Sequence, residues 1–208
     1  MFKNFIMVAI LSALSSNVSA TDRVNIFNAR DLNGWKEKSF EDRTKYTLDA
    51  DGLSASCNSG ASSLYREMAI NLNETPILNW TWTAEKTNGL GNNKERLKSG
   101  DDFVARIYAI VDKGAIIPNV YSLNYVWAQN EQKGEHWPNP FYNKAHMVVV
   151  NSVNQNGTRQ TQSRNLKTDF QKYFGKNIES IDGIAIMSDC DNTGGQATAQ
   201  YGNIYFSP

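Results

Sequence analysis

One stretch of the chain decides its fold class: Asp102-Phe103-Val104-Ala105-Arg106-Ile107-Tyr108-Ala109-Ile110-Val111. Successive side chains of a β-strand point to opposite faces. One face of this stretch would therefore carry Phe103, Ala105, Ile107 and Ala109. The other face would carry Asp102, Val104, Arg106, Tyr108 and Ile110. The pattern predicts a long strand with an apolar face and a second, accessible face that holds polar groups.

Shorter runs of β-branched and aromatic residues, each ended by a polar turn, lie on both sides of this strand. The further strands that we expect cover residues 44–48, 53–56, 61–65, 77–83, 121–128, 145–152, 161–167, 181–188 and 197–206. One short helix is expected at 168–174, with Thr168 as N-cap and Gly175 at its end. Strands at this spacing predict an all-β fold, an antiparallel β-sandwich. Two long connections, 85–101 and 129–143, are of a length that often carries function.

The first residues have the pattern of an export signal. Lys3 is followed by an apolar run from Phe5 to Leu14 and by the small-residue exit Val18-Ser19-Ala20. A retained membrane anchor is the alternative, but the run is shorter than the ~20 residues that a membrane span needs. We expect a signal peptide at 1–20, a single β-sandwich domain at 21–208 without a membrane span, and a periplasmic or secreted location.

Charge and cysteine content narrow the classes of partner. The chain has 21 basic and 21 acidic residues, so it lacks the basic excess typical of nucleic-acid-binding proteins. We therefore expect no nucleic-acid partner.

The two cysteines, Cys57 and Cys190, are expected to form a disulfide, as is usual in an oxidising compartment. Two separate buried thiols are the alternative.

Polar groups on the long strand form the first candidate site. Asp102 and Arg106 would lie on one face about 13 Å apart, so both can line one groove without bonding each other. The arginine fork suits a carboxylate or a set of hydroxyls. In the alternative interpretation, Arg106 pairs with an acid on a neighbouring strand and serves only the sheet.

Aromatic side chains form the second candidate site. Flat rings stack on sugar rings, but they also make good core because each buries a large apolar area. The candidates in strands are Trp80, Trp82, Tyr108, Tyr125 and Trp127. Trp137 and Tyr142 lie in a proline-containing segment that cannot form a central strand. These two side chains are therefore expected to be exposed at the rim of the sheet.

The segment Asp189-Cys190-Asp191-Asn192-Thr193-Gly194-Gly195 is a third candidate. Alternating carboxylate and amide oxygens can bind Ca²⁺, which would make Asp189, Asp191 and Asn192 its ligands. The segment lacks the spacing of an EF-hand, and a polar hairpin turn is the alternative. No other cofactor is expected.

An enzyme has weaker support in the sequence. Signatures of serine hydrolases, zinc proteases and phosphate-binding loops are absent. Two carboxylates can act as acid and base on a glycosidic bond when they lie ~5–9.5 Å apart. Asp102, Asp189 and Asp191 are the candidates, and sequence alone does not place them. Whether the protein is an enzyme therefore stays open.

Several motifs follow one another over nearly all of the chain beyond the signal. They are Leu78-Asn79-Trp80-Thr81-Trp82, Gly100-Asp101-Asp102-Phe103-Val104-Ala105-Arg106-Ile107-Tyr108, Tyr125-Val126-Trp127-Ala128, Arg164-Asn165-Leu166 with Asp169, Gly183-Ile184-Ala185-Ile186-Met187-Ser188-Asp189, Asp191-Asn192-Thr193-Gly194 and Ala199-Gln200-Tyr201-Gly202-Asn203-Ile204-Tyr205-Phe206. With them the chain resembles the domain-of-unknown-function family 3047 of exported bacterial proteins. The resemblance implies a β-sandwich in the envelope or outside the cell, and it supplies no activity. The last motif is similar to the final strand of jelly-roll carbohydrate-binding modules, which implies a sandwich of jelly-roll type.

The leading hypothesis from these observations is an exported, non-catalytic domain that binds a glycan or a similar polyhydroxylated ligand. The expected ligand contacts are Asp102, Arg106, Tyr108, Tyr125, Trp127, Trp137 and Arg164. Two alternatives stay open. One is a hydrolase or lyase that acts on an envelope polysaccharide, and the other is an accessory domain that binds another protein.

Overall fold

The computed structural model describes residues 23–90, 94–114 and 119–208. It has two β-sheets and a single α-helix in these ranges, so the predicted all-β sandwich is confirmed. Within the same ranges, no helix is long and apolar enough to cross a membrane. The expected export signal at 1–20 lies outside the described residues.

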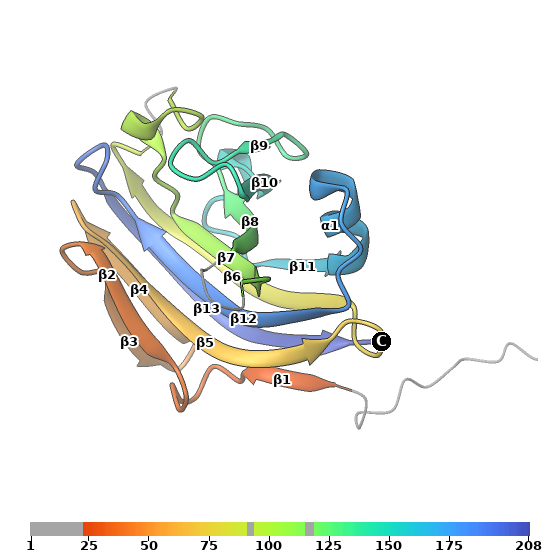
Figure 1. Cartoon of the computed structure of the whole chain (residues 1–208). Coiled ribbons are helices and arrows are strands. Elements are labelled where there is room, and N and C mark those ends of the chain that lie inside the picture. The colour runs from red at the N-terminus through yellow and green to blue at the C-terminus, as the bar shows by residue number, and fades with distance from the viewer. Residues whose placement is uncertain (1–22, 91–93, 115–118) are drawn as a thin grey trace, which may run out of the picture.

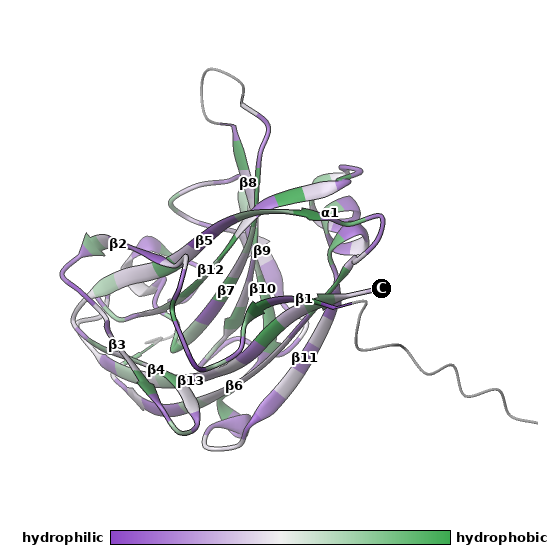
Figure 2. Ribbon diagram, turned by 90° about the horizontal axis from the view of Figure 1, so that it is seen from below, coloured by the Kyte–Doolittle hydropathy of each residue, from purple (hydrophilic) through white to green (hydrophobic). Residues whose placement is uncertain are grey.

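The strands form two layers (Figures 1 and 2). Sheet A has the order β11 (Gln160–Asn165), β6 (Ile77–Asn88), β13 (Gln196–Ser207), β4 (Gly52–Asn58) and β3 (Lys45–Asp49), with β1 (Val24–Phe27) paired to β13. Sheet B has the order β2 (Lys36–Glu41), β5 (Ala61–Asn71), β12 (Ser180–Asp189), β7 (Ala105–Asp112), β8 (Val120–Trp127), β10 (Ala145–Asn151) and β9 (His136–Pro138). Two short 3-10 turns lie at Lys98–Gly100 and Val153–Gln155.

Three strands and one pairing differ from the sequence-based expectation. β1, β2 and β9 were not expected, because β1 and β9 are short and β2 is a fully exposed, charged edge strand without an apolar face. The sheets are antiparallel except for β8 and β10, which pair in parallel. β7 also begins at Ala105 rather than at Asp102.

The helix α1 (Leu166–Phe174) begins two residues earlier than predicted. Its N-cap is Asn165, whose side-chain oxygen accepts a hydrogen bond from the Thr168 backbone N–H at 3.0 Å. The expected end is confirmed, since Gly175 adopts the left-handed conformation that glycine tolerates best. α1 joins β11 of sheet A to β12 of sheet B at one end of the sandwich (Figure 1).

Large aromatic side chains fill the space between the sheets. Trp80 and Trp82 contact each other edge to face at 5.4 Å between ring centroids, and Trp82 lies 5.9 Å from Trp127. Tyr125 joins the same cluster at 5.3 Å from Trp80. All four side chains are buried, so for them the core interpretation of the aromatic residues is correct.

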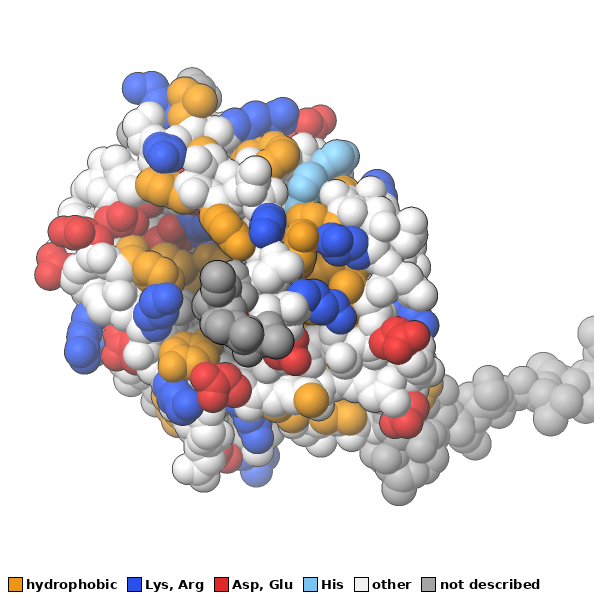
Figure 3. Space-filling model, in the orientation of Figure 1, with side chains coloured by type: hydrophobic (Ala, Val, Ile, Leu, Met, Phe, Trp, Pro, Cys, Tyr) orange, Lys and Arg blue, Asp and Glu red, His pale blue; other side chains and the backbone are white. Residues whose placement is uncertain are grey.

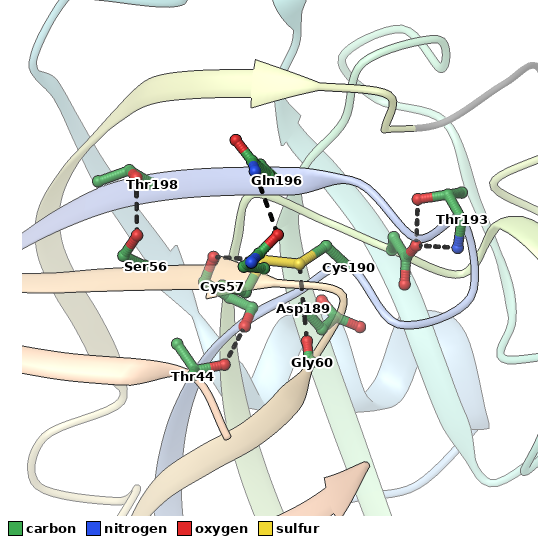
Figure 4. Close-up of a disulfide and its surroundings, with 12 residues drawn as sticks. Thr44, Ser56, Cys57, Gly60, Asp189, Cys190, Thr193, Gln196 and Thr198 are labelled. Atoms are coloured by element: carbon green, nitrogen blue, oxygen red, sulfur yellow. Dashed lines mark hydrogen bonds between the residues drawn. A yellow bond between two sulfur atoms is a disulfide. The ribbon is translucent and has the colours of Figure 1, made fainter. Parts of the chain in front are cut away.

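A disulfide ties the two layers together. Cys57 lies in β4 of sheet A, and Cys190 directly follows β12 of sheet B, with 6.1 Å between their Cα atoms (Figure 4). The predicted pairing of the two cysteines is confirmed. Because the two cysteines are 133 positions apart in the sequence, the bond restricts most of the unfolded chain.

Replacing both cysteines, Cys57→Ala with Cys190→Ala, should lower the free energy of unfolding by about 4 kcal/mol because the open unfolded chain gains conformational entropy. Urea denaturation followed by tryptophan fluorescence measures the loss. A reducing agent should destabilise the wild-type protein and leave the double variant unchanged. Equal stability of the oxidised wild type and the variant would contradict the prediction.

Candidate functional site

The outer face of sheet B carries a groove of about 530 Å³. Its floor comes from β7, β8 and β12, and its walls come from β2, the β9–β10 connection and the β12–β13 turn. The lining residues are Phe40, Ala61, Asp101, Arg106, Tyr108, Val120, Asn124, Asn139, Phe141, Tyr142, Ala145, Met187, Asp189, Asp191 and Asn192. Figure 3 shows a hollow with hydrophobic and acidic side chains on this face.

A buried ion-pair network closes the floor of the groove at one end. The Arg106 side chain, which is 3% exposed, donates from Nε to Asp189 Oδ1 at 2.9 Å and from Nη2 to Asp189 Oδ2. It also donates to the carbonyl and the carboxylate of Asp101. The guanidinium lies over the Phe103 ring at 4.6 Å. Arg106 therefore pairs with acids of its own chain, as the alternative interpretation holds, although it still lines the groove.

Burial raises the pKa of the Asp189 carboxyl, and the Arg106 guanidinium opposes this rise. Burial also raises the pKa of Asp101, which Arg106 and Asn139 oppose. Asp191 lies at the edge of the cluster, and its pKa is raised by partial burial and by the nearby Asp102 charge. Two of these carboxyl groups, Asp101 and Asp189, are paired with the Arg106 guanidinium.

Asp102 does not lie on the groove face as predicted. The regular strand begins only at Ala105, so period-two alternation does not extend back to Asp102. Its side chain is fully buried and accepts hydrogen bonds from the backbone N–H groups of Asn192 (3.2 Å) and Thr193 (2.7 Å). The Thr193 hydroxyl adds a third bond at 2.6 Å (Figure 4). Asp102 fixes the β12–β13 turn.

Exposed aromatic rings form the two walls of the groove. Phe40 is 57% exposed and lies at a register shift in β2, between Ser39 and Glu41. Phe141 and Tyr142 are 55% and 43% exposed on the opposite wall. The predicted exposure of Tyr142 at the rim is therefore correct. Between the walls, the half-buried Tyr108 lies on the floor, as expected.

The wall that carries Phe141 is fixed to the body of the protein. Asn139 accepts hydrogen bonds from the Phe141 and Tyr142 backbone N–H groups, and its amide donates to Asp101 at 2.9 Å. At the start of the same connection, the buried Glu95 accepts three backbone hydrogen bonds from Gln129, Asn130 and Glu131. The long connection predicted to carry function is thus an ordered wall.

Two buried oxygens of groove residues lack partners. Asn124 Oδ1 and Asp101 Oδ1 are both inaccessible to solvent and have no hydrogen-bond partner among the residues that the structure describes. The Asn124 amide group donates to the Met147 sulfur at 3.4 Å. An unpaired buried acceptor costs free energy, which a hydroxyl donor can relieve.

Four other predicted ligand contacts lie outside the groove: Tyr125, Trp127, Arg164 and Trp137. Tyr125 and Trp127 point into the sandwich, where Tyr125 bonds to Asp169 at 2.6 Å and Trp127 bonds to Asn156 at 2.8 Å. Their predicted contact with a ligand is wrong because β8 turns this face inward. Arg164 lies in β11 of sheet A and forms a bidentate pair with Asp169.

The expected exposure of Trp137 is also wrong. Its strand β9 is an edge strand, as the neighbouring Pro138 requires, but the indole is only 6% exposed. It packs 6.3 Å from Phe103 in a second hydrophobic cluster, and the Arg96 guanidinium lies 5.0 Å above it. Trp137 therefore anchors the wall from beneath.

The three candidate catalytic acids, two of which are also candidate metal ligands, lie close together. Asp102, Asp189 and Asp191 place carboxylate oxygens within 4.8 Å of one another. However, the oxygens of Asp102 and Asp189 already accept bonds from the β12–β13 turn and from Arg106. The Asn192 amide points its donor at Asp191, at 2.9 Å. This arrangement supports the polar-turn interpretation, and it does not favour an acid–base pair.

Sequence reasoning missed Phe40, Phe141, Asn124 and Asn139. Phe40 lies in a charged run without alternation, which carries no strand signal. Phe141 adjoins Tyr142 in the proline-containing segment, so the argument that exposes Tyr142 could also have found Phe141. Nothing in the sequence distinguishes Asn124 from other polar residues in strands.

Comparison with known families gives a match over residues 33–205 to the family described as protein of unknown function, DUF3047. The chain belongs to this family. The predicted resemblance is confirmed, and membership of DUF3047 brings no activity with it. A search of curated proteins finds no match.

Solved structures similar to this DUF3047 member include a family 11 carbohydrate-binding module from Clostridium thermocellum in complex with a β-1,3-1,4-mixed-linked tetrasaccharide. The identity is 11% over 91% of this chain and 97% of that chain, with a TM-score of 0.45. The xyloglucanase domain of a type three effector from Sinorhizobium fredii, in complex with cellobiose, is 9% identical over 84% of this chain and 93% of that chain, with a TM-score of 0.46. The xylan-binding module CBM15 is 11% identical over 89% of this chain and 95% of that chain, with a TM-score of 0.41. Similarity at this level concerns the fold and transfers no ligand.

Removing the guanidinium should reveal the cost of the buried carboxylates. Arg106→Met should lower the free energy of unfolding by about 3–5 kcal/mol, because it leaves the buried Asp189 carboxylate without its counter-charge. The pKa of Asp189 then rises further in the folded state. Since the unfolded chain loses this proton at lower pH, stability falls as pH rises, and the loss should be larger at about pH 7 than at about pH 4.

Urea denaturation at the two pH values measures this effect. The double variant Arg106→Met with Asp189→Asn is the matched control, because the neutral amide can still accept the Phe103 N–H bond and carries no charge. It should recover most of the loss at the higher pH. A loss that does not depend on pH would contradict the ion-pair account.

Proposed function

We propose that this protein binds a glycan, or a chemically similar polyhydroxylated ligand, in the groove on the outer face of sheet B. The observation that carries the proposal is the combination of exposed rings on both walls with polar groups on the floor. Phe40 and Phe141 offer flat apolar surfaces, while Asn124 and Asp101 hold oxygens without donors.

A sugar combines the two complementary features. Its axial C–H groups meet the negative face of an aromatic ring, and its hydroxyls donate hydrogen bonds. The Asn124 oxygen is buried, so its amide must turn before a ligand hydroxyl can reach it. A purely apolar ligand would leave these oxygens unsatisfied, and a highly charged one would not use the rings.

The groove also bears on the two alternatives. A flat sheet face would have favoured an accessory domain that binds another protein, whereas this face is hollowed. A polysaccharide-cleaving enzyme needs two available carboxyl groups, and Asp102 and Asp189 are occupied by internal donors. We therefore favour binding without catalysis.

We place this activity in the periplasm or outside the cell. The disulfide between Cys57 and Cys190 supports this location, because such bonds persist in oxidising compartments. The expected export signal at 1–20 agrees with it.

The proposal predicts that the purified protein is retarded in native gels containing a soluble polysaccharide. The panel should include mixed-linkage β-glucan, xyloglucan, xylan, polygalacturonate and alginate, with solubilised peptidoglycan glycan strands as a further probe. Phe141→Ala should weaken binding about tenfold, because the ring forms one wall of the groove. Retardation coefficients at several polysaccharide concentrations give the affinities.

Leu48→Ala is the matched control, since it removes a partly exposed apolar side chain from β3 of sheet A, outside the groove. It should leave the affinity unchanged. Binding that survives Phe141→Ala undiminished, or wild-type protein that no member of the panel retards, would count against the proposed function.

A further inference from the structure

The floor of the groove continues beyond its main part. A second hollow of about 380 Å³ lies beside it on the same face and is lined by Lys38, Ser63, Tyr65, Ile110 and Ala185. Phe40 and Tyr108 line both hollows. The two hollows therefore meet at these rings and form one depression.

The strand register aligns the floor across sheet B. Ala185 of β12 is the direct partner of Tyr65 in β5 and of Tyr108 in β7, and Tyr108 is the direct partner of Asn124 in β8. Side chains at directly opposite positions project from the same face of a sheet. Tyr65, Ala185, Tyr108 and Asn124 thus form one row that runs perpendicular to the strands.

The residue between the two tyrosines is small. Tyr65 and Tyr108 are both half-buried, and Ala185 is the residue between them in this row. Two strand spacings place their backbones about 10 Å apart. A ligand that stacks on both rings must therefore place two of its sugar rings about 10 Å apart, which is farther than the two adjacent rings of a disaccharide reach.

We propose that the ligand is a linear glycan chain that lies across the strands of sheet B, with Tyr108 and Tyr65 as two successive stacking platforms. This inference rests on the proposed function and extends it from a ligand class to a chain and a direction. The chain passes from the wall of Phe141 over Tyr108, crosses the Ala185 gap and reaches Tyr65. A single sugar or a disaccharide occupies only the larger hollow.

Isothermal titration calorimetry tests the proposal with two probes, the disaccharide and the hexasaccharide cut from the polysaccharide that most retards the wild-type protein. The wild type should bind the hexasaccharide at least about tenfold more tightly, because only the longer probe reaches both platforms. Tyr65→Ala should weaken hexasaccharide binding about tenfold and change disaccharide binding by less than about twofold.

Two more variants separate this effect from a change in folding. Ala185→Leu fills the gap between the platforms, so it should also weaken binding of the hexasaccharide selectively. Tyr205→Ala removes a half-buried tyrosine of sheet A that contacts Arg23, and it should affect neither probe.

Equal affinity of the wild type for the two probes, or an equal loss for both probes in Tyr65→Ala, overturns the inference and leaves the proposed function intact. Absence of any polysaccharide binding in the gel experiment overturns the proposed function itself. The two failures are therefore distinguishable.

Discussion

The need to satisfy one buried guanidinium organises the outer face of sheet B. Arg106 lies in the central part of the sheet, where a charge without partners would be costly. Its partners are Asp189, the last residue of β12 before the β12–β13 turn, and Asp101, which lies in the segment before β7. Satisfying the guanidinium therefore draws two irregular segments to one place.

Sheet A takes part in the same arrangement. The Tyr201 hydroxyl of β13 accepts the Arg106 backbone N–H at 2.9 Å and donates to the Met187 carbonyl at 2.7 Å. A side chain from the opposite layer thus completes the backbone pairing of β7 and β12. Together with the disulfide nearby, this contact sets the distance between the sheets where the groove floor lies. The floor is held from behind as well as from its ends.

Local alternation predicts which residues share a face, and it does so well for this chain. Arg106, Tyr108 and Ile110 project together, as do Tyr121, Leu123, Tyr125 and Trp127. Alternation does not say which face looks outward, and this choice depends on how β7 and β8 pack against sheet A. Tyr125 and Trp127 were therefore placed on the wrong side. The prediction for Asp102 was wrong for another reason. The segment before β7 is irregular, and its Phe103 N–H bonds to the Asp189 side chain instead of to a neighbouring strand, so strand alternation does not apply to Asp102.

The parallel pairing of β8 and β10 has a consequence for how this scaffold can diversify. Parallel neighbours cannot be joined by a tight turn, so the chain must travel back the full length of the strands before β10 can start. This returning segment passes over the outer surface and is anchored by Trp137. Its residues from Asn139 to Tyr142 take no part in the packing between the two sheets. Insertions or exchanges there would reshape one wall of the groove while the interior keeps its residues. This wall can therefore vary while the packing between the two sheets stays the same.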